Sequence, residues 1–398
     1  MKSQISPKPP SVSVGYNNLI QHIQGRPPPK VTQASFQPQY PTASTAQNIT
    51  QQTEALATSL KDATFPTISS INRKLPYCQT GARTVDVGDE VRQADLCGKY
   101  VCTLGHAVKV WNVLTGEMLC SIAQTDRDIK ATALAFKPAA TSDDEGSRLW
   151  LGTNSGDLQE IEVAKQTVHH GRSGAHERRE ITKIHRYQNA MWTIDDSGQL
   201  CVWPGDDSGL PSLRGKYHLH RVQKGHSCSL VIQGSLWLAT GHDVWIYRPT
   251  TEDSTAFSVL SKPLSQPQCG TITCGTVVAN QWDLAFFGHT DGKISVFSTS
   301  SLECVALVSV NIYKVTAIVG AGSFLWTAFS VGTMSVFDTS TSPWNTKKTW
   351  IGHQGQPIHG LAVDRSGLWK HGALRILSYG SENLLRFWDG TLSHDWMG

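Results

Sequence analysis

The stretch GKISVF, residues 292–297, is followed forty residues later by GTMSVF, residues 332–337. Both strings begin with a turn residue and then alternate variable and apolar positions up to a large terminal residue. The pattern recurs at residues 106–111, 156–161, 198–203, 242–247 and 383–388. The seven copies end at intervals of 40 to 51 residues. We therefore interpret the chain as one small unit repeated seven times.

Each copy is predicted to be the second strand of a hairpin. RLWLGTNSG ends at residue 156, AMWTIDDSG ends at residue 198 and FLWTAFSVG ends at residue 332, so a strand and a tight turn precede these copies. Another apolar run lies upstream, as at residues 129–136, and a fourth often follows, as at residues 118–123. Four strands in a period of this length are typical of one blade of a β-propeller, which buries its faces only against neighbouring blades.

Large aromatic residues recur at equivalent positions of the repeat. Because such positions usually belong to packing, we expect these side chains to fill the gaps between blades and not to form a ligand cage. They are Trp111, Trp150, Trp192, Trp203, Trp237, Tyr247, Phe297, Trp326, Phe337 and Trp388.

The repeats resemble those of WD-repeat propellers in a degenerate form. In that family a Gly-His pair opens each repeat and its histidine joins a buried hydrogen-bonded network, and Trp-Asp ends the repeat. Of five Gly-His pairs here, Gly225-His226 and Gly352-His353 have the expected position, and Trp-Asp ends one repeat, at residues 388–389. Strands and packing are therefore expected to supply most of the stability.

The predicted fold class is all-β: a seven-bladed WD-repeat-like β-propeller over residues 79–398, preceded by a disordered tail at residues 1–78. The last copy ends ten residues before the end of the sequence, so we expect RTVDVG, residues 83–88, to supply the outer strand of the seventh blade and close the ring. Ten of the eighteen prolines and none of the thirteen tryptophans lie in residues 1–80, which explains the predicted disorder. The proline motifs of the tail are candidate ligands for SH3-like or WW-like domains.

Charge is unevenly distributed. Residues 1–80 hold seven Lys and Arg against two acids, while the remainder holds 28 basic and 30 acidic residues. A near-neutral propeller argues against nucleic acid as a partner. The basic-patch candidates, which with the tail could attract phosphoinositide membranes, are Arg178, Arg179, His218, Arg221, Lys224, Lys347 and Lys348.

No catalytic, cofactor-binding or metal-binding residue is predicted. His218 and His220 alternate on one predicted strand, but no cluster of cysteines or carboxylates recurs beside them. The nine cysteines are scattered and are interpreted as small buried hydrophobic residues in a reducing compartment. With no signal peptide and no long apolar run, the expected location is cytoplasmic or peripheral to membranes.

Several ordered strings resemble the N-terminal propeller of fungal inositol polyphosphate 5-phosphatases. They include CGKYVCTLGHAVKVWNVLTGEML, RLWLGTNSGDLQEIEV, GSLWLATGHDVWIYRP, FGHTDGKISVF and RFWDGTLSHDW, and the resemblance covers residues 75–398. The resemblance implies a following catalytic domain of the endonuclease/exonuclease/phosphatase class that uses Mg²⁺ to remove the 5-phosphate from inositol lipids or phosphates. The metal-loop and WCDR strings of that domain are absent here, and no cofactor is expected in this chain.

The resemblance thus implies a non-catalytic propeller that targets such an enzyme by binding proteins or peptides through its face. An alternative is a free-standing WD-repeat scaffold of an unrelated pathway. An enzyme with its site inside the propeller is the weakest of the three hypotheses.

Overall fold

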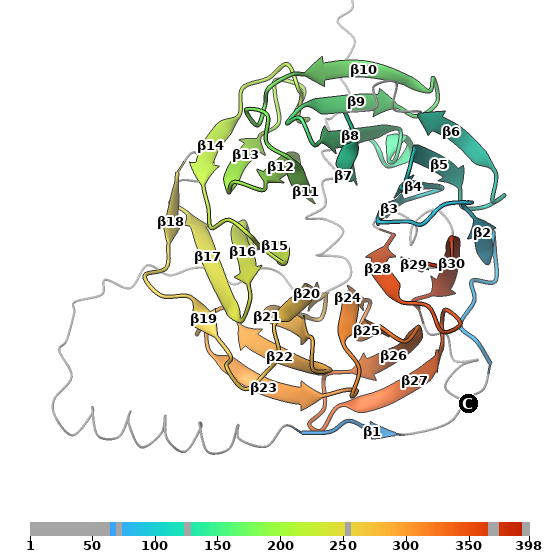
Figure 1. The fold of residues 1–398 in the computed structure, drawn as a ribbon, viewed down its shortest axis with the longest axis vertical. Helices are drawn as coiled ribbons and strands as arrows, with labels where there is room; N and C mark the ends of the chain where they lie inside the picture. The colour runs from blue at the N-terminus through green and yellow to red at the C-terminus, as the bar shows by residue number, and fades with distance from the viewer. Residues whose placement is uncertain (1–63, 69–73, 123–128, 251–255, 365–373, 392–398) are drawn as a thin grey trace, which may run out of the picture.

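The computed structural model describes residues 64–68, 74–122, 129–250, 256–364 and 374–391. Seven β-sheets stand around a central axis like the blades of a wheel (Figure 1). The predicted all-β, seven-bladed propeller is confirmed. In the described residues a short 3-10 helix, η1 (Ser142–Asp144), joins two strands of the second blade. The helices among these residues include none long and apolar enough to cross a membrane.

Each blade is an antiparallel sheet whose first strand is innermost. The inner strands of blades one to seven are β3 (Gln93–Cys97), β7 (Ala131–Phe136), β11 (Ile181–Tyr187), β15 (Cys228–Ile232), β20 (Ile272–Val278), β24 (Val315–Ala321) and β28 (Ile358–Val363). The second strands are β4 (Tyr100–Leu104), β8 (Arg148–Thr153), β12 (Ala190–Asp195), β16 (Ser235–Thr240), β21 (Gln281–His289), β25 (Phe324–Phe329) and β29 (Arg375–Gly380).

The third strands coincide with the seven copies found in the sequence. They are β5 (Val108–Asn112), β9 (Leu158–Glu162), β13 (Gln199–Trp203), β17 (Asp243–Pro249), β22 (Lys293–Ser298), β26 (Thr333–Asp338) and β30 (Leu384–Asp389). The outer strands are β6 (Met118–Ile122), β10 (Thr167–Arg172), β14 (His218–Arg221), β18 (Phe257–Val259) with β19 (Leu264–Ser265), β23 (Cys304–Ser309), β27 (Asn345–Ile351) and β2 (Thr84–Asp86).

The turn between the second and third strands explains the glycine that opens several copies. Gly198, between β12 and β13, has a φ of +83°, a region that side chains disfavour. A Cβ atom there would also collide with the carbonyl oxygen of Val222. This position therefore needs glycine for conformation and for space.

Alternation along the strands supplies apolar side chains to both faces of every blade. In β12, Met191 packs into the seam with blade two and Trp192 into the seam with blade four. Seven apolar clusters result, one between each pair of neighbouring blades, including blades seven and one. The hydrophobic core is therefore a closed ring of seams.

Polar bonds cross several of these seams at a repeated irregularity of the inner strands. Five inner strands shift register one residue after their start, at Thr132, Thr182, Thr273, Thr316 and His359. Thr132 and Thr273 donate from Oγ1 to the carbonyl of the first residue of the next inner strand, at 2.7 and 2.6 Å. These bonds tie neighbouring blades together near the axis.

The ring closes through β2, which lies within the stretch 83–88. Val85 faces Leu385 in the antiparallel pairing of β2 with β30, so β2 is the fourth strand of blade seven. Val85 is 5% exposed and packs in the cluster between blades seven and one. The segment before blade one thus completes the last blade.

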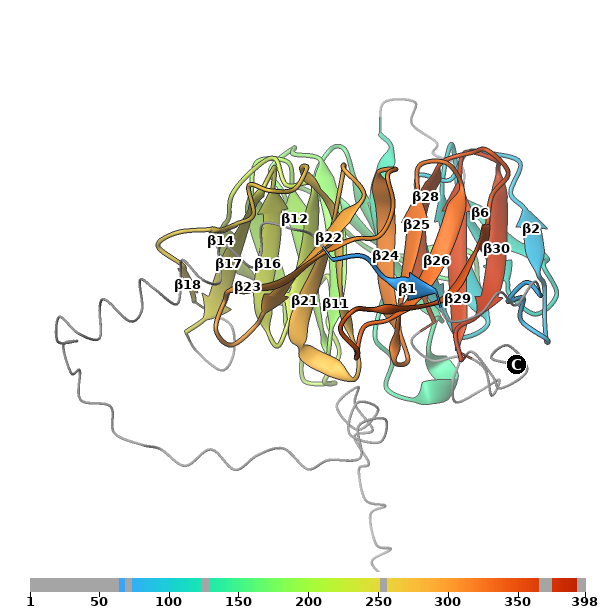
Figure 2. The same ribbon diagram turned by 90° about the horizontal axis from the view of Figure 1, so that it is seen from below.

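Two pieces of the predicted tail pack on the propeller, which corrects the prediction of disorder up to residue 78. We call residues 64–68 and 74–78 the N-terminal strap. Its strand β1 (Thr67–Ile68) lies outside the ring and pairs with β27 in parallel (Figures 1 and 2). Tyr77 stacks on Trp388 with ring centroids 4.9 Å apart. The rest of the predicted tail, residues 1–63 and 69–73, lies outside the described residues.

Candidate functional site

The ten aromatic residues found in the repeat are buried, and none of them is more than 8% exposed to solvent. Trp150, Trp192, Trp237 and Trp326 have equivalent positions, because each faces the next-to-last residue of its copy of the repeat: Glu160, Val202, Ile246 and Val336. All four pack into seams between blades. Burial makes these four tryptophans core residues without access to a ligand.

Blade three contains a chain of four buried polar groups. Trp203 donates from Nε1 to Oγ1 of Thr193 at 3.1 Å, and this hydroxyl lies 2.7 Å from Nε2 of His176. His176 Nδ1 lies 2.9 Å from Oδ2 of Asp195. All four residues are 0% exposed. The Asp-His-Thr arrangement has the order of a hydrolytic triad, but its burial and the bond from Trp203 give it a structural role.

Blade seven repeats this chain with a longer carboxylate. Trp388 donates from Nε1 to Oγ of Ser378 at 2.8 Å, and Nε2 of His353 lies 2.8 Å from the same oxygen. His353 Nδ1 lies 2.7 Å from Oε1 of Glu382. This is the network that the pair Gly352-His353 implies. His226, in the other predicted pair, is half-buried and lies 3.4 Å from Thr182 of blade three.

Sequence reasoning missed His176 because alanine, not glycine, precedes it. It precedes Arg178 and Arg179, two of the predicted basic-patch residues, in the charged string HERRE at residues 176–180. A usable signal was available: His176 lies upstream of Trp203 in the same repeat, as His353 lies upstream of Trp388. A search for histidine alone at this position would have found both.

Burial and hydrogen bonding set the protonation of the two networks. Burial acts to raise the pKa of Asp195, but hydrogen bonds from His176, the backbone of Gln199 and Ser197 outweigh it and lower that pKa. Burial lowers the pKa of His353 to about 4, although the Glu382 carboxylate acts in the opposite direction. At neutral pH the imidazole of His353 is therefore uncharged.

The predicted basic residues differ in their exposure. Arg178, Arg179, Arg221 and Lys224 are exposed, and His218 is half-buried on β14. Exposed Glu177 and Glu180 flank the two arginines of residues 178–179. The sequence pattern of a basic face is thus interrupted by acids at this end of blade three.

Two of these predicted basic residues are engaged within blade six. Lys347 forms an ion pair with Asp338 at 3.3 Å, between Nζ and Oδ2. Lys348 is 6% exposed and its ammonium group donates to the carbonyl of Lys74 in the strap. Lys348 is therefore excluded as part of a surface patch, since burial and the strap cover it.

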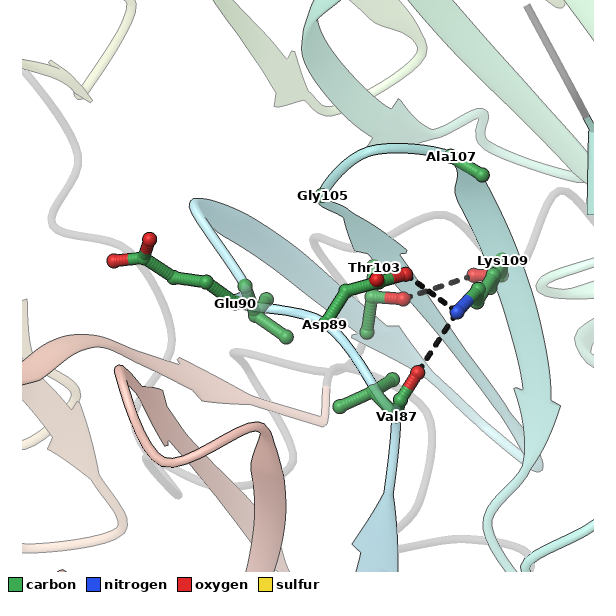
Figure 3. Close-up of a pocket in the computed structure, with 8 residues that line it drawn as sticks. Val87, Asp89, Glu90, Thr103, Gly105, Ala107 and Lys109 are labelled. Atoms are coloured by element: carbon green, nitrogen blue, oxygen red, sulfur yellow. Dashed lines mark hydrogen bonds and ion pairs between the residues drawn. The ribbon is translucent and has the colours of Figure 1, made fainter.

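A small hollow between blade one and the closing segment, residues 87–91 that lead from β2 to β3, is already filled by a side chain (Figure 3). Lys109 extends into it and donates from Nζ to the carbonyl of Val87 at 2.8 Å and to Asp89 at 2.6 Å. Glu90 and Thr103 also line this hollow, which leaves no room for a water molecule. We interpret it as part of the packing of the closing segment.

A larger pocket lies on the outer side of the seam between blades five and six. We call it the inter-blade groove; its volume is about 390 Å³. The lining residues include Phe65, Asn311, Ile312, Ser335, Phe337 and Thr349. Phe65 belongs to the strap, Ile312 to the loop after β23, and Phe337 to β26. Apolar surface and a few hydroxyl and amide groups therefore meet in one concave site, the usual composition of a ligand pocket.

Large apolar side chains are exposed at and beside this groove. Ile312 is 83% exposed and Phe65 is 70% exposed, and both line the groove. Ile351, two residues beyond the lining residue Thr349 on β27, is 63% exposed. Single exposed apolar residues are ordinary on protein surfaces, whereas several around one pocket indicate an interaction site.

The loop that carries Ile312 is held in place by its own hydrogen bonds. Asn311 Oδ1 accepts the backbone N–H of Ile312 at 2.8 Å and that of Tyr313 at 3.3 Å. The N–H groups of Val310 and Asn311 donate to the carbonyl of Gly292 at 3.0 and 3.1 Å. A fixed loop loses little conformational entropy on binding, which favours its use as a recognition element.

The loops above the groove carry almost no charge. The backbone of Ser330 donates to Lys314, and that of Gly352 donates to Gly332, so loops 310–314, 330–332 and 352–357 are neighbours. Their sequences contain no carboxylate, and Lys314 is their one charged side chain because His353 is neutral. The turn at residues 290–293, which contacts this loop through Gly292, adds Asp291 and Lys293, and these two form an ion pair at 2.9 Å. Lys314 is therefore the one charge of these loops and this turn that is not balanced by a neighbouring carboxylate in the same segments.

In the part of the chain that the structure describes, no group of three or more His, Cys, Asp or Glu residues could hold a metal ion. The nine cysteines are free thiols, and six of them are buried. Burial raises the pKa of Cys78 to about 11 and that of Cys201 to about 12. These two thiols are therefore protonated and poor nucleophiles at neutral pH.

The amino-acid sequence of the chain is similar to part of a longer phosphatase. It is 34% identical over 341 residues to a probable inositol polyphosphate 5-phosphatase of Schizosaccharomyces pombe, a match that covers 84% of this chain and 28% of that protein. The chain thus spans little more than a quarter of this relative. The predicted resemblance to inositol polyphosphate 5-phosphatases is confirmed. No protein-family model matches the sequence.

A chain in the crystal structure of the mitotic checkpoint complex has the same fold. It superposes with a TM-score of 0.61 at 16% sequence identity, over 83% of this chain and 97% of that chain. At this identity the similarity shows the propeller architecture alone.

Proposed function

We propose that this propeller is the non-catalytic interaction and targeting module of an inositol polyphosphate 5-phosphatase. The observation that carries the proposal is the extent of the match: it takes up most of this chain but 28% of the phosphatase. Most of that relative's length is therefore available for catalysis elsewhere. In this view the parent enzyme removes phosphate from inositol lipids or phosphates in the cytoplasm, and the propeller decides where it acts.

The features of the propeller support a binding role. Its triad-like His176 group is completely buried, while the exposed apolar residues Phe65 and Ile312 share a pocket at the rim. Propellers of seven blades present broad loop-lined faces and grooves that suit protein partners. The geometry therefore favours recognition over chemistry in this part of the enzyme.

A phosphate-release assay tests the non-catalytic part of the proposal. The purified chain is incubated with Mg²⁺ and either phosphatidylinositol 4,5-bisphosphate vesicles or soluble inositol trisphosphate, and the full-length Schizosaccharomyces pombe relative serves as the reference. We expect no release by the propeller above the protein-free background. Metal-dependent release from either substrate would overturn this part.

A deletion in the relative tests the targeting part. The region that matches this chain is removed from the full-length phosphatase, and turnover in solution and location in the cell are both measured. We expect the deletion variant to retain turnover and to lose its normal distribution. Lost turnover with an unchanged distribution would assign the propeller a catalytic support role instead.

A further inference from the structure

The propeller already binds one extended segment across the seam between blades five and six: its own strap. Thr64 donates its N–H to the carbonyl of Leu307 at 3.2 Å and accepts from the N–H of Ser309 at 2.9 Å, both on β23. Three residues later Thr67 donates to the carbonyl of Trp344, beside β27, at 2.7 Å. The outer rims of the two blades thus recognise extended backbone, as in β-strand addition.

The inter-blade groove continues directly from this strap. Phe65 and Pro66, between the two anchoring points, form one wall, and Ile312 contributes to the lining from the blade-five side. Phe337 reaches the groove from β26 and is 2% exposed, so its ring is fixed by the core. A volume of about 390 Å³ accommodates one large apolar side chain with its flanking backbone.

The polar groups of the groove suit the backbone of such a segment. Asn311, Ser335 and Thr349 line it with an amide and two hydroxyls, and the described lining contains no charged side chain. A charged side chain would lose its hydration there without gaining a partner. The bound residue should therefore be apolar, with its peptide groups beside these hydroxyls and amide.

We infer that the inter-blade groove binds an extended peptide segment of a partner protein and takes one large apolar side chain of it between Phe65 and Ile312. The inference rests on the proposed targeting function and names the chemistry of the partner. Continuity with the strap argues for a peptide, because the same rim already pairs with extended backbone. A lipid surface is disfavoured, since the neighbouring loops and turn supply two cations, Lys314 and Lys293, and Lys293 is paired with Asp291. Membrane-binding surfaces cluster several cations.

The experiment uses the full chain and a library of random peptides displayed on phage. Peptides selected on the unmodified chain are synthesised with a fluorophore, and their dissociation constants are measured by fluorescence anisotropy. The test variants are Ile312→Ser and Phe65→Ser. The matched control is Val168→Ser on β10 of blade two, where a 52% exposed apolar residue lies far around the ring.

We expect the selected peptides to share a large apolar residue. Ile312→Ser and Phe65→Ser should each weaken binding about tenfold or more, because each removes a large apolar side chain that the bound peptide covers. Val168→Ser should change the dissociation constant by less than about twofold. Ile312→Leu should restore most of the affinity. Equal melting temperatures of all variants, expected from their exposure, exclude unfolding as the cause.

Three results would overturn the inference. Selected peptides could lack an apolar consensus, or bind Ile312→Ser as well as the unmodified chain, or lose affinity equally with Val168→Ser. Sedimentation with vesicles of neutral and anionic lipids that is abolished by Ile312→Ser would assign the groove to a membrane instead. Peptides that bind elsewhere on the propeller would show that the inter-blade groove is not the binding site, but they would agree with the targeting function. Phosphate release by the chain would contradict the proposed non-catalytic function and would not test peptide binding to the groove.

Discussion

Trp203 and Trp388 are repeat residues that stabilise their blades through a buried hydrogen bond as well as through packing. Each is the last residue of its copy of the repeat, and each donates its indole N–H to a hydroxyl on the neighbouring second strand, on Thr193 and Ser378. A histidine and a carboxylate complete both chains. Because the tryptophans, hydroxyls and histidines are buried, the loss of one partner leaves the others with unmet hydrogen bonds.

The substitution His176→Ala tests the buried network of blade three. It leaves Asp195 and Thr193 without their shared partner inside the protein, and we expect the free energy of unfolding to fall by about 2–4 kcal/mol. The control is His226→Ala, at a half-buried position outside such a network, which should cost less than about 1 kcal/mol. Urea unfolding followed by tryptophan fluorescence measures both. Equal losses would contradict the distinction between the two histidines.

The network of blade seven predicts a loss of stability in acid. His353 has a folded-state pKa of about 4, below the value near 6.5 of an unfolded chain. As the pH falls below 6.5, His353 is protonated in the unfolded chain but stays neutral in the folded protein. The free energy of unfolding therefore decreases until the pH reaches about 4. Between pH 7 and pH 5 this contribution is about 2 kcal/mol.

The substitution His353→Gln isolates this contribution, since glutamine does not titrate. The variant should be less stable than the unmodified protein at pH 7, but the gap should narrow by about 2 kcal/mol at pH 5. Denaturant titrations at both pH values check the result. A constant gap would show that His353 takes up its proton equally well in the folded state.

At the scale of elements, the strands whose pattern is local in sequence could be predicted, and the segments ordered by distant residues could not. Every third strand could be located, because alternation and a turn residue, glycine in several copies as at Gly198, lie within a few residues of one another. The strap could not, because β1 has two residues and shows no periodicity. Tyr77 is ordered by Trp388, at the other end of the chain. The inter-blade groove was missed for the same reason, since Phe65 and Ile312 meet only in the folded ring.

The strap predicts unequal effects for its two aromatic residues. Tyr77→Ala removes a ring that stacks on Trp388, and we expect it to lower the free energy of unfolding by about 1–3 kcal/mol. Phe65→Ala, at a position 70% exposed, should cost less than about 0.5 kcal/mol. Paired thermal and urea unfolding measurements compare the two. Similar costs would mean that the strap binds the propeller through Phe65 as much as through Tyr77.

At the scale of the whole molecule, the propeller depends on a seam between the two ends of its chain. Blades seven and one are joined by an apolar cluster to which the closing strand β2 contributes Val85. Each other seam joins blades that follow one another in sequence. The closing seam joins distant parts of the chain, so its loss turns a ring into an open array whose blades no longer stabilise one another in both directions.

The substitution Val85→Asp is expected to open this seam. Val85 is 5% exposed and faces Leu385, so a carboxylate there is buried without a partner and should cost more than about 3 kcal/mol. Thr84→Asp is the matched control, because Thr84 lies next to it on the exposed face of β2 and should cost less than about 0.5 kcal/mol. Hydrogen exchange should show that strands β28–β30 lose protection in Val85→Asp before strands β11–β13 do. Uniform loss of protection around the ring would mean that the propeller unfolds as one unit even when its closing strand fails, and that closure adds stability without setting where unfolding begins.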